Sequence, residues 1–332
     1  MSSFTSLDLG AQGFGGMALA DAYGPADQTA ALATLHHAVD AGIRLIDTAD
    51  VYGGGSNERL VGRLLRERRD EVVLATKFGF VRPDEHDGRR FRGDPAYARQ
   101  AAQASLARLG VERIDLYYLH RVDPLVPIEE SIGALAELVA DGIVAHVGVS
   151  EVTASELERA HAVHPITAVQ SEWSVWSRDV EDQVVPTAAR LGVGFVAYSP
   201  LGRGFLASRE PVAEFADGDL RRSFPRFDPE HLDANARIAG VVRAAAARLG
   251  ITPAQLALAW LAERGRALGI PLVSIPSTRR PDRIDENLAA REIRLDAETL
   301  AELDALAASV AGDRARNAAD ISQGRERLEA VR

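Results

Sequence analysis

The sequence predicts an α/β fold, a (β/α)8 TIM barrel with long loops at the C-terminal face of its strands. Stretches typical of strands and of helices alternate eight times along the chain, and no change of composition marks a domain boundary. Repeated βα units give parallel strands joined by right-handed crossovers. Eight such units close into a barrel of about 250 residues plus insertions, and an open doubly wound sheet is the alternative. We therefore expect one barrel domain over residues 1–332.

Composition narrows the functions that this chain can have. Its 332 residues are 46% hydrophobic and 26% charged, as in ordinary globular proteins. The formal net charge of −10 argues against nucleic-acid binding, which needs a basic face. There is no cysteine for a disulfide framework or a thiolate metal site, which fits the reducing cytosol. The N-terminus lacks the features of a signal peptide, and no apolar run is long enough to cross a membrane. We expect a cytoplasmic protein without a metal, and the sequence carries no signal for an oligomeric state.

Hydrophobic periodicity places helices along the whole chain. Apolar residues recur at helical spacing over 28–41, 56–68, 95–109, 126–142, 153–163, about 180–191, 232–249 and 253–264, and a further helix is expected at 280–290. Ser56 can cap the second of these helices, and Pro95 suits the first turn of the third. The Arg- and Ala-rich tail from about residue 312 is expected to run irregularly over the surface.

Apolar, β-branched runs between these helices predict the strands. They lie at 10–19, 43–47, 72–77, 115–119, 143–150, 166–174, 193–199 and 271–276. The stretch 192–197 matches the dinucleotide-binding fingerprint, but it enters a strand where that motif must leave one, so we reject it. The irregular segment 200–228 is long enough to be a functional lid.

Ionisable side chains stand where three early strands end. They are Asp47, Lys77 and His120, with Tyr52 five residues beyond the first. Strand ends carry the chemistry in parallel α/β folds. Lys77 is the only lysine among 38 basic residues, and a lysine is a compact charge whose pKa moves on burial, whereas arginine is a planar fork. Each residue alone has an ordinary alternative: Asp47 as a helix cap, His120 as a core imidazole, and Lys77 as a chance survivor in an arginine-rich chain.

Together, these four residue types predict a proton relay. A tyrosine, with a pKa near 10, is a poor acid at neutral pH. A neighbouring ammonium lowers that pKa, and a carboxylate holds the ammonium in place. A histidine opposite can donate to a carbonyl oxygen. Such a site suits the reduction of a carbonyl group or the oxidation of an alcohol, and it needs a cofactor as the hydride donor.

Seven motifs occur in the order known from one enzyme family. They are IDTADVYG, LATKFG, DLYYLHRVD, VGVSE, AVQSEWS, AYSPLGRGFL and IPSTRRPDRIDENL. The chain resembles the aldo-keto reductase superfamily over about residues 9–290, and the stretches HRVDPLVPIEE and RGDPAY are most similar to the subgroup of perakine reductase and auxin-induced-like reductases. The resemblance implies a barrel that binds NADP(H) across its C-terminal face. It also implies a catalytic tetrad of Asp47, Tyr52, Lys77 and His120, with Tyr52 as the acid.

The resemblance also implies where the cofactor binds. Ser150 and Gln170 would hold the nicotinamide carboxamide, and Tyr198 would stack on the ring. The pyrophosphate would lie along Ser199, Pro200, Leu201, Gly202, Arg203 and Gly204. The adenosine end would lie at Ile275, Ser277, Thr278, Arg279, Arg283, Glu286 and Asn287. Arginines beside a helix N-terminus form an anion site by themselves. Ser277 departs from the glycine usual in the nearest relatives.

We predict an NADPH-dependent reductase of small aldehydes or ketones. The residues expected around the carbonyl compound are Met17, Tyr23, Phe78, Phe80, Trp173 and Trp176, and they favour an apolar or aromatic substrate. The alternative is that these six belong to the core. A second function stays open, a cofactor-binding regulatory subunit with little turnover, because fold and cofactor alone do not prove an enzyme. A non-redox barrel would leave the arginines near the chain end unexplained.

Overall fold

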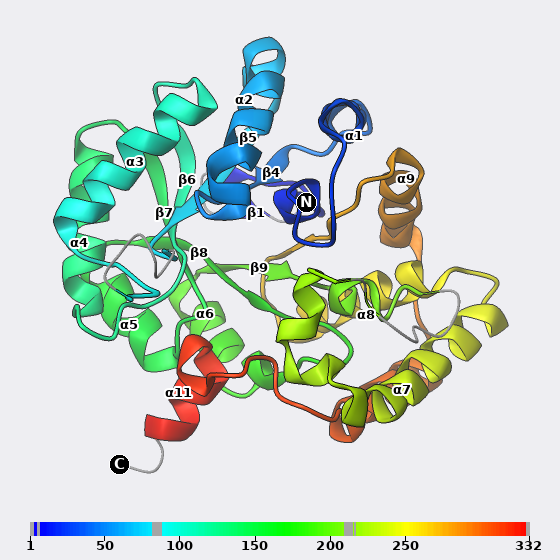
Figure 1. Cartoon of the computed structure of the whole chain (residues 1–332). Coiled ribbons are helices and arrows are strands. Elements are labelled where there is room, and N and C mark those ends of the chain that lie inside the picture. Colours follow the sequence, from blue (N-terminus) through cyan, green and yellow to red (C-terminus); the bar gives the residue numbers. More distant parts are fainter. Residues whose placement is uncertain (1–2, 5–6, 82–87, 209–214, 216, 330–332) are drawn as a thin grey trace.

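The computed structural model describes residues 3–4, 7–81, 88–208, 215 and 217–329 and shows a (β/α)8 barrel (Figure 1). Its eight parallel strands are β3 (Phe14–Gly15), β4 (Leu45–Asp47), β5 (Val73–Phe78), β6 (Ile114–Leu119), β7 (Val144–Ser150), β8 (Ile166–Glu172), β9 (Gly194–Tyr198) and β10 (Leu272–Ile275). Each strand pairs with the next one along the chain. The barrel closes where Gln12 forms a parallel bridge with Ser274 and the Gly13 amide donates to the Ser274 carbonyl at 2.9 Å. The predicted fold class is confirmed.

A tightly packed apolar interior supports the strands. Leu9 is fully buried and packs with Leu45, Leu116, Val196 and Val273 inside the barrel. It follows a short antiparallel hairpin formed by β1 (Ser3–Phe4) and β2 (Leu7–Asp8). Because this packing fills the barrel, the reactive side chains are confined to the opposite, C-terminal ends of the strands.

Helices cover the outside of the barrel. They are α1 (Gln28–Asp40), α2 (Ser56–Arg68), α3 (Pro95–Leu109), α4 (Ile128–Ala140), α5 (Ala154–Val163), α6 (Val184–Leu191), α7 (Pro229–Arg248), α8 (Pro253–Ala267), α9 (Pro281–Ala289), α10 (Ala297–Asp304) and α11 (Ser322–Glu329). Of these, α1, α3, α5, α8 and α10 begin directly after a residue whose side chain caps the helix. Thr153 and Glu156 form a reciprocal capping box at the start of α5. Gly110 ends α3 in the left-handed conformation that glycine adopts most easily.

The first strand is shorter than the expected 10–19. Only Phe14–Gly15 lies in β3, and Gly16–Leu19 turns into a 3-10 helix. A Cβ at Gly16 would lie 2.9 Å from the carbonyl oxygen of Asp47 and 2.7 Å from Asn57 Oδ1. Because glycine has no Cβ, the chain can approach the end of β4 closely at Gly16 and turn there, and the strand ends at Gly15.

The described part of the tail, residues 312–329, runs without regular structure to Asn317 and packs on the barrel before it ends in a helix. Asn235 on α7 accepts a hydrogen bond from the Ala311 amide at 3.0 Å and donates to the Ala311 carbonyl at 2.9 Å. Arg314 is only 4% exposed. The chain then continues into α11, which lies against the barrel near α5 and α6 in Figure 1.

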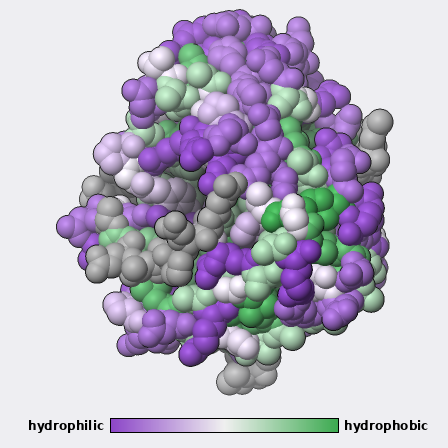
Figure 2. All heavy atoms as spheres, turned by 90° about the vertical axis from the view of Figure 1, so that its right-hand side faces the viewer, coloured by the Kyte–Doolittle hydropathy of each residue, from purple (hydrophilic) through white to green (hydrophobic). Residues whose placement is uncertain are grey.

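The surface is mainly polar on the side where α7, α8 and α9 lie. Figure 2 shows this face covered mostly by hydrophilic residues, with smaller groups of hydrophobic ones between them. Among the described residues, no helix is both long and apolar enough to cross a membrane.

Candidate active site

The four side chains predicted at the strand ends meet in one place. Asp47 is the last residue of β4, Lys77 lies one residue before the end of β5, and His120 directly follows β6. Tyr52 begins the 3-10 helix Tyr52–Gly55 that follows β4. These three strands are neighbours in the barrel. Because parallel strands end at the same face, residues distant in the sequence come together there.

Lys77 is fixed as a buried positive charge. Its side chain is fully buried, and Nζ donates to Asp47 Oδ1 at 2.5 Å and to the Thr48 carbonyl oxygen at 2.8 Å. The same nitrogen lies 5.2 Å from the centre of the Tyr52 ring. Burial disfavours the ammonium, but Asp47 and Tyr52 outweigh this effect and raise the pKa of Lys77. The lysine therefore stays charged beside the phenol.

Tyr52 and His120 face each other across the site. Their ring centres are 6.0 Å apart, and the ring planes meet at 82°. Burial raises the pKa of Tyr52 by more than Lys77 lowers it. The expectation of a lowered tyrosine pKa is therefore wrong for this structure, because desolvation of the phenolate outweighs the ammonium.

His120 is a neutral imidazole. Burial, together with the charges of Arg121 and Lys77, holds the pKa of His120 well below its usual range. Within the described part of the chain, Nδ1 of this ring is buried and has no hydrogen-bond partner. A neutral imidazole carries one N–H donor. His120 can therefore donate to an oxygen atom without adding a charge to the site.

The residues implied for the nicotinamide lie on β7, β8 and β9, and Gln170 contacts the ion pair. Ser150, the last residue of β7, is the register partner of Gln170, which lies two residues before the end of β8. Gln170 Nε2 donates to Asp47 Oδ2 at 2.9 Å. Tyr198 ends β9, and its hydroxyl donates to Glu151 Oε1 at 2.7 Å. A hydroxyl, an amide and an aromatic ring thus lie on consecutive strands, and the amide contacts Asp47.

The segment 199–204 makes a tight turn after β9. Ser199 and Arg203 adopt φ values of 48° and 56°, in the left-handed region that is uncommon for residues other than glycine. A Cβ at Gly202 would lie 2.7 Å from the Trp176 indole, so glycine lets this turn lie directly on the ring. Successive backbone amides in such turns can form an anion-binding concavity.

The predicted adenosine end lies between β10 and α9. Ile275 is the buried last residue of β10. Ser277 Oγ donates to the Gly15 carbonyl at 2.5 Å and accepts from the Ala18 amide at 3.0 Å. Ser277 therefore ties this turn to the segment after β3.

The two arginines expected at the adenosine phosphate are placed differently. Arg283 on α9 is partly exposed and pairs with Glu286 at 3.0 Å. Asn287 is buried one residue beyond this pair, and the half-buried Thr278 accepts from the Arg280 amide at 3.1 Å. Arg279 instead donates to three carbonyl oxygens of the segment 18–25, at 2.6–3.0 Å. Arg283 is thus better placed than Arg279 to meet a ligand.

Three of the six residues expected around the substrate lie in the core. Phe78, Trp173 and Trp176 are at most 2% exposed and belong to one large hydrophobic cluster. Trp173 also donates from its indole to Glu181 Oε1 at 2.9 Å. Their burial agrees with the core alternative.

The other three are half-buried at the C-terminal side of the barrel. They are Met17, Tyr23 and Phe80. The Phe80 ring lies 5.7 Å from the His120 ring. It also lines a cavity of about 280 Å³ together with Val51, the residue before Tyr52. This cavity adjoins the site on the Tyr52 side.

Sequence reasoning missed the roles of Glu151 and Asp50. Glu151 follows the VGVS strand end and is fully buried at a φ of 51°. Burial opposes its charge, but Arg314 and Arg121 outweigh burial and hold the pKa of Glu151 far below its usual range. Burial and the charge of Glu58 raise the pKa of Asp50 to about 8. The available signal for Glu151 was a charged residue directly after a strand-end serine. The sequence gave no signal that Arg314 in the tail would be its partner.

Comparison with known proteins identifies the family. Residues 12–308 match the sequence model of the Aldo/keto reductase family, so the chain belongs to this family of oxidoreductases. Among solved structures it is similar to the glycerol dehydrogenase AKR11B4 from Gluconobacter oxydans, with 28% identity over 92% of this chain and 93% of that one and a TM-score of 0.80. An aldo/keto reductase from Klebsiella pneumoniae, solved in complex with NADP and acetate, is 28% identical over 92% and 95% of the two chains, with a TM-score of 0.69. AKR11C1 from Bacillus halodurans, in its holo form, is 27% identical over 92% and 95%, with a TM-score of 0.66.

Proposed function

We propose that this protein reduces an aldehyde or ketone to an alcohol with NADPH, and that Tyr52 supplies the proton. The observation that carries the proposal is the contact of Lys77 with both Asp47 and the Tyr52 ring, with the His120 ring opposite. The positively charged Lys77 beside the phenol favours transfer of the Tyr52 proton, because it stabilises the phenolate that remains. The neutral His120 can orient a carbonyl oxygen.

The residues present fit the cofactor. The Ser150 and Gln170 pair matches a carboxamide, the turn 199–204 suits a pyrophosphate, and Arg283 beside the start of α9 suits a phosphate. When bound, NADP(H) would supply or accept the hydride. A Klebsiella pneumoniae aldo-keto reductase, 27% identical over 93% of this chain, was solved in complex with NADPH.

In the proposed reaction, the carbonyl carbon gains a hydride and the carbonyl oxygen gains the Tyr52 proton. Lys77 stabilises the phenolate that remains, and Asp47 keeps Lys77 in position. The neutral His120 donates to the oxygen as negative charge develops on it. We further propose that residues 1–332 act as one domain in the cytosol, and that the nearest subgroup is that of perakine reductase and auxin-induced-like reductases.

A single-turnover assay tests this proposal against the role of a regulatory subunit. Enzyme loaded with one equivalent of NADPH is mixed with an aromatic aldehyde, and the loss of NADPH absorbance is followed. We expect oxidation of the cofactor that depends on the aldehyde, with one alcohol formed for each NADPH consumed. Bound NADPH that is stable towards a panel of aldehydes and ketones would instead favour the binding role.

A further inference from the structure

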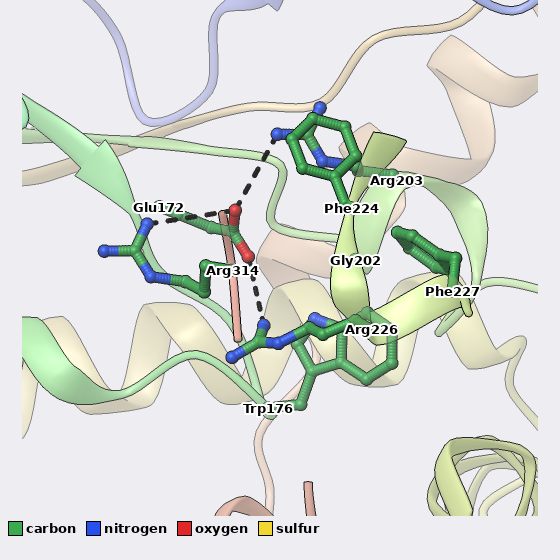
Figure 3. Close-up of a pocket in the computed structure, with 8 residues that line it drawn as sticks. All are labelled: Glu172, Trp176, Gly202, Arg203, Phe224, Arg226, Phe227 and Arg314. Carbon is green, nitrogen blue, oxygen red and sulfur yellow. Dashed lines mark hydrogen bonds and ion pairs between the residues drawn. The ribbon is translucent and has the colours of Figure 1, made fainter. Parts of the chain in front are cut away.

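A second group of buried charges connects the C-terminal tail to the barrel. We call it the tail cluster, and its members are Glu151, Glu172, Asp179, Arg203, Arg226 and Arg314. Figure 3 shows the Glu172 carboxylate lying among the guanidinium groups of Arg203, Arg226 and Arg314. Their nearest nitrogen atoms are 3.9, 3.3 and 4.0 Å from its oxygen atoms. None of these residues belongs to the predicted tetrad.

Arg314 makes the closest contacts of the cluster. Its side chain is 1% exposed. Nη1 and Nη2 donate to the two carboxylate oxygens of Glu151 at 3.0 and 3.2 Å, and Nη2 also donates to Asp179 at 2.8 Å. A forked pair of this kind fixes the orientation of both partners, which a lysine could not do.

Glu151 carries this constraint to the predicted nicotinamide site. It directly follows Ser150, its amide donates to the Gln170 carbonyl at 3.0 Å, and its Oε1 accepts the Tyr198 hydroxyl at 2.7 Å. Burial and the Glu151 charge raise the pKa of Tyr198, so the hydroxyl remains a donor. The left-handed backbone of Glu151 is uncommon for this residue type and needs support from its surroundings.

We propose that Arg314 is a positioning residue for the nicotinamide half of the cofactor, and that it acts by holding Glu151 and, through it, Ser150 and Tyr198. The proposal rests on the proposed NADPH-dependent function. The predicted binding site of the adenosine half is held by other contacts. Ser277 and Arg279 are tied to the segment after β3, and Arg283 pairs with Glu286. The tail should therefore affect one half of the cofactor and not the other.

The test compares two ligands on one variant. NADPH binding to Arg314→Ala is titrated by nicotinamide fluorescence, and binding of adenosine 2′,5′-bisphosphate, which carries only the adenosine half, is measured by calorimetry. We expect NADPH to bind about tenfold more weakly, as for the loss of one charge-assisted hydrogen bond. The bisphosphate should bind as it does to the wild type.

Arg316→Ala is the matched control. This arginine lies two residues further along the tail, is 56% exposed, and pairs with Asp228 at 2.6 Å. It should bind both ligands normally. Wild-type affinity of folded Arg314→Ala for NADPH would overturn the proposal, and so would an equal loss for both ligands.

A second series applies if Arg314→Ala does not fold. Arg314→Lys keeps the charge but cannot fork onto Glu151, and should show a smaller selective loss of NADPH affinity. In a Tyr198→Phe background, which lacks the hydroxyl held by Glu151, the same lysine substitution should have a reduced effect. Full additivity of the two substitutions would show that Arg314 does not act through Tyr198. A wild-type protein that binds no NADPH would refute the proposed function itself, whereas normal NADPH binding by the Arg314 variants would refute only this inference.

Discussion

Two buried ionisable groups at the C-terminal side of the barrel, Glu151 of the tail cluster and His120 of the predicted tetrad, differ in how completely their hydrogen-bonding capacity is used. In the tail cluster, Glu151 accepts hydrogen bonds from Arg314, Tyr198 and the Ser322 hydroxyl and amide. In the predicted tetrad, His120 Nδ1 has no hydrogen-bond partner among the described residues.

This difference separates two uses of a buried charge. A carboxylate with every lone pair occupied holds parts of the chain together, and it offers nothing to a ligand. A group that is buried with unused hydrogen-bonding capacity is poised to bind one. The contrast therefore assigns chemistry to the tetrad and positioning to Glu151. The first two predictions below test the tetrad, and the last two concern residues outside both groups.

The largest effect is expected for Tyr52→Phe. The variant should fold and bind NADPH, because only a hydroxyl is lost, but kcat should fall by about 10²–10⁴, the usual contribution of general acid catalysis. Steady-state kinetics and a fluorescence titration of NADPH measure the two quantities. A variant that kept most of its kcat would show that another group is the acid.

Lys77→Arg tests whether the tetrad needs this particular cation. A guanidinium is larger and would fork onto Asp47, so less positive charge would lie beside the phenol. The pKa of Tyr52 should rise further, and the alkaline limb of the kcat profile should move to higher pH. A shift of one pKa unit corresponds to about 1.36 kcal/mol, so the plateau rate should fall by about tenfold.

The measurement is a pH–rate series on both proteins. NADPH affinity should change little, because the predicted cofactor contacts are made by other residues. If Lys77 had survived among arginines by chance, the two profiles would coincide at every pH.

Arg283→Ala extends the comparison to the adenosine end, away from both buried groups. The arginine is partly exposed beside the start of α9. Losing a charge-assisted hydrogen bond to the 2′-phosphate should weaken NADPH binding by about tenfold. NADH, which lacks this phosphate, should be affected far less. An equal loss for both cofactors would contradict the assignment.

The tetrad was predictable from the sequence because each member lies beside a recognisable strand. Leu45 and Ile46 before Asp47, and Val73 and Leu74 before Lys77, are runs that indicate buried strands, and parallel strands bring their ends together. The helices were predictable for the same reason, since periodicity and capping residues are local.

The tail cluster was not predictable, because its partners are remote. Arg314 and Glu151 are 163 positions apart, and nothing near either residue indicates that the other will be its partner. The burial of the tryptophans was not predictable for a different reason. Strands of a closed barrel are buried on both faces, so the sequence around Trp173 does not tell a core position from a position at the substrate opening.

A partly exposed carboxyl, Asp50, belongs to neither group and provides the smallest predicted effect. Its Oδ1 is buried without a hydrogen-bond partner among the described residues, and burial and Glu58 raise its pKa to about 8. Its unfolded-state pKa is near 3.9. Between these values the folded chain holds a proton that the unfolded chain has lost, so stability should fall as pH rises from about 4 to about 8.

Asp50→Asn removes this titration while keeping the shape of the side chain. At pH 5 Asp50 has lost little of its stabilising proton, whereas at pH 8 nearly the whole destabilisation is present. The Tm of the variant minus the Tm of the wild type should therefore be larger at pH 8 than at pH 5. Because Asp50 is partly exposed, we expect a relative gain of about 2–4 °C, equivalent to roughly 1 kcal/mol for a chain of this size.

Asp233→Asn, at an exposed position on α7, is the control and should follow the wild type at both pH values. Thermal melts of the three proteins decide the matter: a constant difference between Asp50→Asn and the wild type would show that Asp50 carries no raised pKa, and that the contrast between satisfied and unsatisfied buried charges does not extend to it.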